Sequence, residues 1–242
     1  LRQPRNVQRK SFERKKKFAI CTFICIMIFL IIYFLFFESR VFGGPWSGFN
    51  HYLSLKFSTF GYDEEMADAL LDVFVHGEFT KNQPASTVSS ILDIGCGIGT
   101  YLKQFHTAGV KRTVCIEPQK MGVFFQSGPK QIIGNVLDSN FKHFKKYDLV
   151  MSIEVAEHIE RNKHDDFFDF MVSHTKCWIF FSGAQPNQPG TGHIAGRETR
   201  DWASEFEERG LIEVPAMANY IRSNSRLYYF HTNPLVFKLK TC

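Results

Sequence analysis

Two carboxylates and an imidazole stand close together in the stretch Glu154-Val155-Ala156-Glu157-His158. If this stretch forms a helical turn, the three side chains occupy positions i, i+3 and i+4 and share one face. A further imidazole, His193, lies in a polar loop over residues 183–194, and loops of this length usually carry function. Carboxylate oxygens favour Mg²⁺ or Mn²⁺, and imidazoles also admit Zn²⁺ or iron. The candidate metal ligands are Glu154, Glu157, His158 and His193.

The same two histidines have a possible role without a metal. An imidazole whose pKa lies near the working pH can take the proton of a hydroxyl group as that group attacks. His158 and His193 are therefore also the candidate catalytic bases. The spacing alone leaves both interpretations open.

A glycine-rich turn follows a short apolar run over residues 91–102. The run, Ile-Leu-Asp-Ile, predicts a buried parallel strand. The sequence Gly-Cys-Gly-Ile-Gly that comes next allows a sharp turn and a close approach of the backbone to a ligand. A helical pattern then begins at Thr100, so its first amides point at the turn. This combination predicts a nucleotide-binding site.

The chemistry of the turn selects among nucleotides. A dinucleotide site has Gly-x-Gly-x-x-Gly, whereas here the third glycine, Gly99, comes one residue early. Asp93 stands just before the first glycine, where a carboxylate repels phosphate and suits an ammonium group. These features disfavour a nicotinamide cofactor and favour a cationic nucleoside without phosphate, S-adenosylmethionine (SAM). Glu117, twenty residues after Gly97, is placed to accept the ribose hydroxyls.

On these motifs the chain resembles the class I SAM-dependent methyltransferases over roughly positions 60 to 240. The resemblance implies an α/β fold, a Rossmann-like seven-stranded sheet with helices on both faces. Asn135 stands where the family has an acidic residue facing the adenine, with Asp138 as the alternative. The cofactor-binding residues that the resemblance implies are Asp93, Gly95, Cys96, Gly97, Gly99, Glu117, Asn135, Val136 and Ser152.

The acidic and histidine side chains of residues 154–158, with His193, resemble the sites of two further families. The Glu-x-x-Glu-His turn with a later histidine is similar to the metal site of small-RNA 2′-O-methyltransferases, and the turn alone to ubiquinone-pathway O-methyltransferases. In those families the metal binds vicinal oxygens of the acceptor. Many small-molecule methyltransferases instead carry a hydrophobic-Glu-His turn without a metal, in which the histidine is structural or touches the substrate.

The N-terminal part of the chain predicts a membrane anchor. Residues 18–37 contain no charged side chain, and twenty apolar residues span a bilayer core of about 30 Å. A cleaved signal peptide is the alternative, since Ser39 and Gly43-Gly44 follow. We predict a basic cytosolic tail over 1–17, a transmembrane helix over 18–37, a connector over 38–60 and a methyltransferase domain over 61–242.

The distribution of charge bears on orientation and partners. Residues 1–17 hold eight basic side chains and one acid, a net charge of +7. The whole chain has a net charge of +5, so the remaining residues carry −2. The positive-inside rule puts the N-terminus in the cytosol and the catalytic domain on the lumenal or outer side. A cytosolic domain stays open, because SAM is made in the cytosol and because Cys96, Cys115 and Cys177 are expected to be buried thiols, not disulfides. A domain near −2 argues against nucleic acid as partner.

The sequence as a whole predicts a membrane-anchored O-methyltransferase that acts on a hydroxyl of a sugar, glycan or other polyol, with Mg²⁺ (or Mn²⁺ or Zn²⁺) as a possible second cofactor. A quinone or lipid phenol is the alternative acceptor. A SAM-binding scaffold without catalysis is the alternative of another class. The oligomeric state is not predicted.

Overall fold

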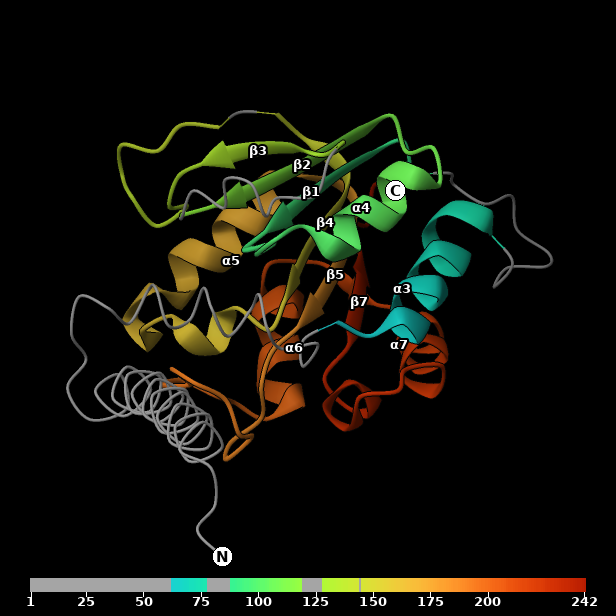
Figure 1. The fold of residues 1–242 in the computed structure, drawn as a ribbon. Coiled ribbons are helices and arrows are strands. Elements are labelled where there is room, and N and C mark those ends of the chain that lie inside the picture. The colour runs from blue at the N-terminus through green and yellow to red at the C-terminus, as the bar shows by residue number, and fades with distance from the viewer. Residues whose placement is uncertain (1–61, 78–87, 119–127, 144) are drawn as a thin grey trace, which may run out of the picture. The chain divides into compact units, whose positions relative to one another are not determined.

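Seven strands form one sheet in the order β3-β2-β1-β4-β5-β7-β6 (Figure 1). The structure is a computed structural model that describes residues 62–77, 88–118, 128–143 and 145–242. All strand pairs are parallel except those of β7, which runs antiparallel to β5 and to β6. The strands are β1 Ser90–Ile94, β2 Arg112–Glu117, β3 Lys130–Ile133, β4 Tyr147–Ile153, β5 Thr175–Ser182, β6 Ile212–Glu213 and β7 Leu235–Lys238.

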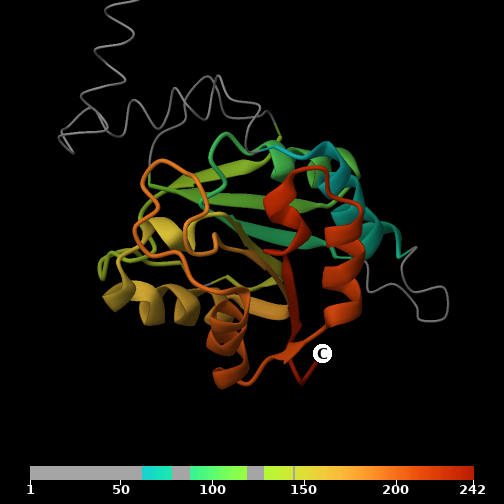
Figure 2. The ribbon, with the colours of Figure 1, turned by 90° about the horizontal axis from the view of Figure 1, so that it is seen from below.

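Helices cover both faces of this sheet (Figures 1 and 2). One face packs against α3, α4 and α7, and the other against α5 and α6. The longer helices are α3 Glu64–Leu71, α4 Thr100–Thr107, α5 His164–Ser173, α6 Thr199–Glu208 and α7 Pro215–Ser223. Shorter helical segments are η2 Asp72–His76, η4 Ala156–His158, η5 Arg161–Lys163 and η6 Tyr228–His231. The predicted α/β sheet of seven strands is confirmed.

Strand side chains alternate between two hydrophobic cores, as the pleat of a strand requires. Ile91 belongs to the core under α3, α4 and α7, and its neighbour Leu92 to the core under α5 and α6. The second core is aromatic, with Phe168, Phe181 and Trp202 fully buried and their ring centroids 5.6–6.1 Å apart. Because both faces of the sheet are buried, its strands are held rigidly. The strands in turn fix the positions of the turns at their carboxyl ends.

Two disulfides correct the expectation that the cysteines are buried thiols. Cys96 pairs with Cys115, and Cys177 with Cys242, at Cα–Cα distances of 5.8 and 5.2 Å. The Gly95 amide donates to the carbonyl of Ile116 (2.8 Å), which continues the parallel pairing of β1 with β2 and brings Cys96 to Cys115. The pairing of β7 with β5 carries the C-terminal residues to Cys177. Neither juxtaposition is visible in the linear sequence.

The predicted membrane segment, residues 18–37, lies outside the described residues, as do the tail over 1–17 and the connector over 38–60. Among the helices of the described part, none combines the length and the apolar character that crossing a bilayer requires.

Replacing both Cys177 and Cys242 by serine is expected to lower the free energy of unfolding by about 2–4 kcal/mol, because the bond closes a long loop of the unfolded chain. Denaturant titration without reductant measures the difference. Cys177→Ser alone should lose the same amount, since each variant removes one bond. Equal stability of the wild type with and without reductant would show that the bond does not form.

Candidate active site

The glycine turn after β1 takes a shape that only glycine adopts freely. Gly95, Gly97 and Gly99 have φ values of 77°, 55° and 76°, all in the left-handed region. A Cβ atom on Gly95 would also lie 2.6 Å from a methyl carbon of Val155, which leaves no room for a side chain. Gly99 is the residue before α4, so the turn leads directly into the first amides of that helix.

Asp93 lies beneath this turn as a buried carboxylate. Its side chain is 3% exposed, and no hydrogen bond or ion pair to it is found within the described residues. Burial raises the pKa of Asp93 well above its usual range, and the neighbouring charge of Glu117 raises it further. Both causes disfavour the ionised carboxylate, so a cation placed here would be strongly stabilised.

Glu117 and the Cys96–Cys115 disulfide fix the turn against β2. The Glu117 carboxylate, at the end of that strand, accepts a hydrogen bond from the Gly97 amide (3.1 Å). The disulfide ties the middle of the turn to a residue two positions before Glu117. The backbone that would surround SAM and the acid proposed for its ribose therefore form one cross-linked unit.

Three other predicted cofactor residues are engaged within the protein. The Asn135 side chain accepts from the Leu137 amide (3.0 Å), which closes a local turn. Ser152 is fully buried, and its hydroxyl donates to the carbonyl of Ile94 (2.9 Å), so it joins β4 to β1. Val136 packs partly buried against the aromatic core. Their roles toward a cofactor stay predictions.

At the carboxyl end of β4 the structure brings Glu157, His158 and His193 together. One ligand atom from each residue lies within 4.8 Å of the other two. Among the described residues, this is the one group of three such side chains close enough together to bind a metal ion. The Nε2 atom of His193 lies 3.7 Å from the Glu157 carboxylate. The two imidazole ring centroids are 5.0 Å apart.

The surroundings of the Glu157 carboxylate compensate its burial only in part. The side chain is fully buried, and among the described residues neither of its oxygens has a hydrogen-bond partner. Burial raises the pKa of Glu157, and the charge of Glu154 raises it further, while the nearby backbone amides of Glu157 and Ala184 offset part of the rise. A buried carboxylate with two imidazoles beside it has the donor chemistry of a divalent-cation site.

Backbone carbonyls set the tautomer of both imidazoles. The Nδ1 atom of His158 lies 3.0 Å from the carbonyl of Gly192, and that of His193 lies 3.0 Å from the carbonyl of Gln188. A carbonyl only accepts, so each Nδ1 carries the proton, and Nε2 is the nitrogen that bears the lone pair in each neutral ring. This is the state that a metal ligand or a general base requires.

Glu154 does not join this cluster, and the predicted helical face over residues 154–158 is wrong. Glu154 has a φ of 53°, in the left-handed region, and the helical turn η4 begins only at Ala156. The carboxylate of Glu154 accepts hydrogen bonds from the Ser182 hydroxyl, from Gln188 (2.6 Å) and from Asn233 (3.0 Å). It therefore holds the loop that carries His193.

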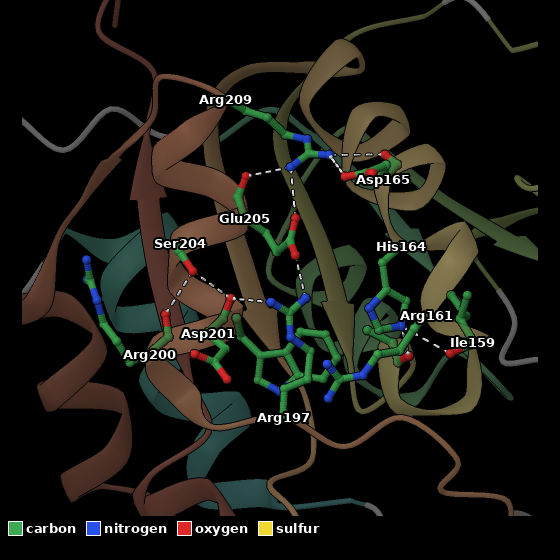
Figure 3. A network of polar contacts seen from close by, with 12 residues as sticks. Ile159, Arg161, His164, Asp165, Arg197, Arg200, Asp201, Ser204, Glu205 and Arg209 are labelled. Atoms are coloured by element: carbon green, nitrogen blue, oxygen red, sulfur yellow. Dashed lines mark hydrogen bonds and ion pairs between the residues drawn. The ribbon is translucent and has the colours of Figure 1, made fainter.

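Polar contacts link α5 to α6 and to the segments on either side of α6 (Figure 3). The buried His164 ring donates from Nε2 to the carbonyls of Ala156 and Ile159, each at 3.1 Å, which locks the turn that bears Glu157. Arg197, just after the loop, pairs with Glu205, and Arg209 binds the other oxygen of that carboxylate at 2.9 Å.

Sequence reasoning did not find Gln188, Asn233 or His164, which position the cluster. Gln188 has a weak sequence signal, since it lies in the amide-rich loop that was predicted to carry function. Asn233 comes from a segment far along the chain and reaches Glu154 only through the fold. His164 is the first residue of α5, and the sequence pattern there does not distinguish it from a surface residue.

Comparison with known proteins identifies the class of this fold and site. A family model described as a methyltransferase domain matches residues 61–222. The chain belongs to this family, and it is a class I SAM-dependent methyltransferase. No curated protein matches the chain.

Several solved structures share the fold. The plantazolicin methyltransferase BpumL, solved with a substrate analog and SAH, is 13% identical with a TM-score of 0.53, over 82% of this chain and 93% of that chain. A SAM-dependent methyltransferase from Archaeoglobus fulgidus is 14% identical with a TM-score of 0.50, over 74% and 96%. Magnesium protoporphyrin IX methyltransferase from Synechocystis, solved with SAH, is 14% identical with a TM-score of 0.50, over 78% and 84%.

Asp93→Asn keeps the shape of the buried side chain and removes its charge. We expect SAM to bind about 10- to 100-fold more weakly, the range for losing a hydrogen bond to a charged group. The ligand-free protein should not lose stability, because an unpaired buried charge is removed. Calorimetric titration with SAM measures the first effect and thermal unfolding the second, with the exposed Asp166→Asn as the matched control.

The pH dependence gives a second test of the same residue. The raised pKa of Asp93 means that the carboxyl must lose a proton before it can pair with the cation. Wild-type SAM affinity should therefore rise with pH across the acidic range, and the affinity of Asp93→Asn should stay flat there. If SAM affinity changed with pH in the same way in both proteins, Asp93 would not be the residue that pairs with the cation.

Proposed function

We propose that this chain is an O-methyltransferase that transfers the methyl group of SAM to a hydroxyl of a sugar, glycan or other polyol, with help from a divalent cation. The observation that carries the proposal is the fully buried Glu157 carboxylate, which has no hydrogen-bond partner among the described residues and has a ligand atom within 4.8 Å of those of His158 and His193. The cluster lies at the carboxyl edge of the sheet, at the same edge as the glycine turn, where α/β folds place their ligands.

The three side chains fit a divalent cation, since a carboxylate and two imidazoles are common ligands and, within the described residues, the carboxylate has no hydrogen-bond partner. Glu157, His158 and His193 would hold it. When bound, such a cation supplies Lewis acidity, which lowers the pKa of a hydroxyl coordinated to it.

The protein's own residues position the reaction and handle the proton. The sulfonium of SAM already carries a good leaving group, so alignment of the hydroxyl oxygen with the methyl carbon supplies much of the rate. His193 is held by the Gln188 carbonyl, with Nε2 3.7 Å from the Glu157 carboxylate, so without a cation this atom can accept the hydroxyl proton as the carbon–oxygen bond forms. With a cation held there, the same lone pair would be a ligand, and the hydroxyl proton would pass to water. The side chain of Glu154 holds Gln188 and thus fixes the loop.

The location of the domain is part of the proposal. The apolar segment 18–37 would anchor the chain, and the basic residues before it favour a cytosolic N-terminus. The two disulfides support a catalytic domain on the lumenal or outer side, because such bonds persist in oxidising compartments. Glycans are assembled on that side, which supports a sugar hydroxyl as acceptor.

One observation favours a quinone or lipid phenol as a second candidate acceptor. Ile194, directly after His193, is 64% exposed although it is large and apolar. Its side chain would suit an apolar acceptor that approaches the cluster from the bilayer. A scaffold role without catalysis predicts SAM binding without product, so formation of S-adenosylhomocysteine separates the two.

The proposal is tested with the full chain, labelled SAM and fractionated glycans, quinones, lipids and RNA as acceptors. We expect label on a hydroxyl of the glycan fraction. Label on the quinone or lipid fraction alone would replace the acceptor class and leave the enzyme class intact. Binding of SAM without any labelled product would favour the scaffold.

Glu157→Gln is expected to lower kcat by about 100-fold or more, an effect typical of losing a group that acts at the transition state. EDTA should do the same to the wild type. The exposed Glu160→Gln, three residues away, is the matched control and should keep full activity. Full wild-type turnover in EDTA would leave His158 and His193 as bases without a metal.

A further inference from the structure

A second pocket opens at the amino edge of the sheet, at the far end of β2 from the cofactor turn. Its volume is about 310 Å³. Arg112 begins β2 and Glu117 ends it, so roughly 16 Å of strand separates the pocket from the cofactor turn. The pocket is lined by His106, Lys111, Arg112, Thr113, Val114, Gly128, Lys130, Ile132, His143, Lys145 and Tyr147.

Four cationic side chains converge on this pocket without an acid in its lining. Lys111 and Arg112 come from the start of β2, Lys130 from the start of β3 and Lys145 from the segment before β4. No ion pair within the described ranges involves any of the four. Asp148, on β4, is already engaged by Lys176 (3.2 Å) and by two serine hydroxyls, which lower its pKa to about 2.

Arg112 is fixed in place and still has donor capacity. Its guanidinium lies 4.2 Å from the centroid of the Tyr147 ring and donates from Nη2 to the carbonyl of Lys146 (2.6 Å). Its Nε–H is buried and has no hydrogen-bond partner. A guanidinium held this way is preorganised for a planar or tetrahedral oxyanion.

Two histidines line the pocket: the pKa of His143 reflects the electrostatic potential there, and His106 packs against Gly128. Burial lowers the pKa of His143, and the charges of His174, Lys145, Arg112 and Lys130 lower it further. The effect shows an excess of positive potential where the His143 ring lies. Gly128 has a φ of 117°, and a Cβ there would meet the His106 ring at 2.3 Å, so glycine lets that imidazole stay in the pocket wall.

We propose that this pocket binds a phosphate group, either free or carried by the headgroup of an anionic lipid. A phosphate dianion has the charge that four unpaired cations favour and several acceptor oxygens for the Arg112 and lysine donors. The rest of the domain carries no excess basic charge along which a nucleic acid would lie. The site is separate from the methyl-transfer site and does not depend on its function.

The test uses the full chain in phosphatidylcholine nanodiscs and calorimetric titration with inorganic phosphate. We expect saturable binding, weakened about tenfold by Arg112→Gln and by Lys145→Gln, since each removes a charge-assisted contact. Lys142→Gln, an exposed lysine outside the lining, should bind like the wild type, and all variants should keep their SAM affinity. By NMR, phosphate should raise the pKa of His143, because an anion offsets the cations around it.

Nanodiscs that contain phosphatidic acid distinguish the two sources. Weaker apparent affinity for phosphate in these discs assigns the pocket to a lipid headgroup, because the headgroup competes. Unchanged affinity assigns it to a soluble phosphate. The proposal is overturned if the wild type shows no saturable phosphate binding, or if Lys142→Gln weakens binding as much as Arg112→Gln, since the attraction would then be diffuse.

Discussion

Two buried carboxylates, Asp93 and Glu157, for which no hydrogen bond is found among the described residues, are the constraint around which this domain is arranged. Burying an unpaired carboxylate is unfavourable by several kcal/mol, so such groups persist only where the surrounding structure holds them. Both lie at the carboxyl edge of the sheet, one beneath the glycine turn and one in the η4 turn. A cation at each position would turn the penalty into an attraction.

The rest of the site prevents these carboxylates from relaxing toward water. The Cys96–Cys115 disulfide cross-links the glycine turn to β2, and His164 locks the backbone around Glu157. Glu154 adopts a left-handed conformation and binds the loop that brings His193 to the cluster. Strain and buried charge of this kind concentrate at functional sites, where binding of the ligand relieves them.

Sequence patterns predicted the features that arise within one element or one turn. The apolar run before Asp93 and the three glycines fix a strand and a turn through local sterics, and the structure confirms that strand and that turn. What the pattern missed depends on contacts between distant segments. The disulfide of Cys177 needs the pairing of β7 with β5, and the role of Glu154 needs Asn233, which is 79 positions away.

The central claim is that the unpaired Glu157 carboxylate selects a divalent cation, and the most direct measurement is the binding of Mn²⁺ to the SAM-saturated full chain, followed by the electron paramagnetic resonance of the free ion. The account predicts one saturable site in the wild type and in Glu160→Gln, and its loss in Glu157→Gln. Absence of a saturable site in the wild type, or the same binding by Glu157→Gln, would contradict it.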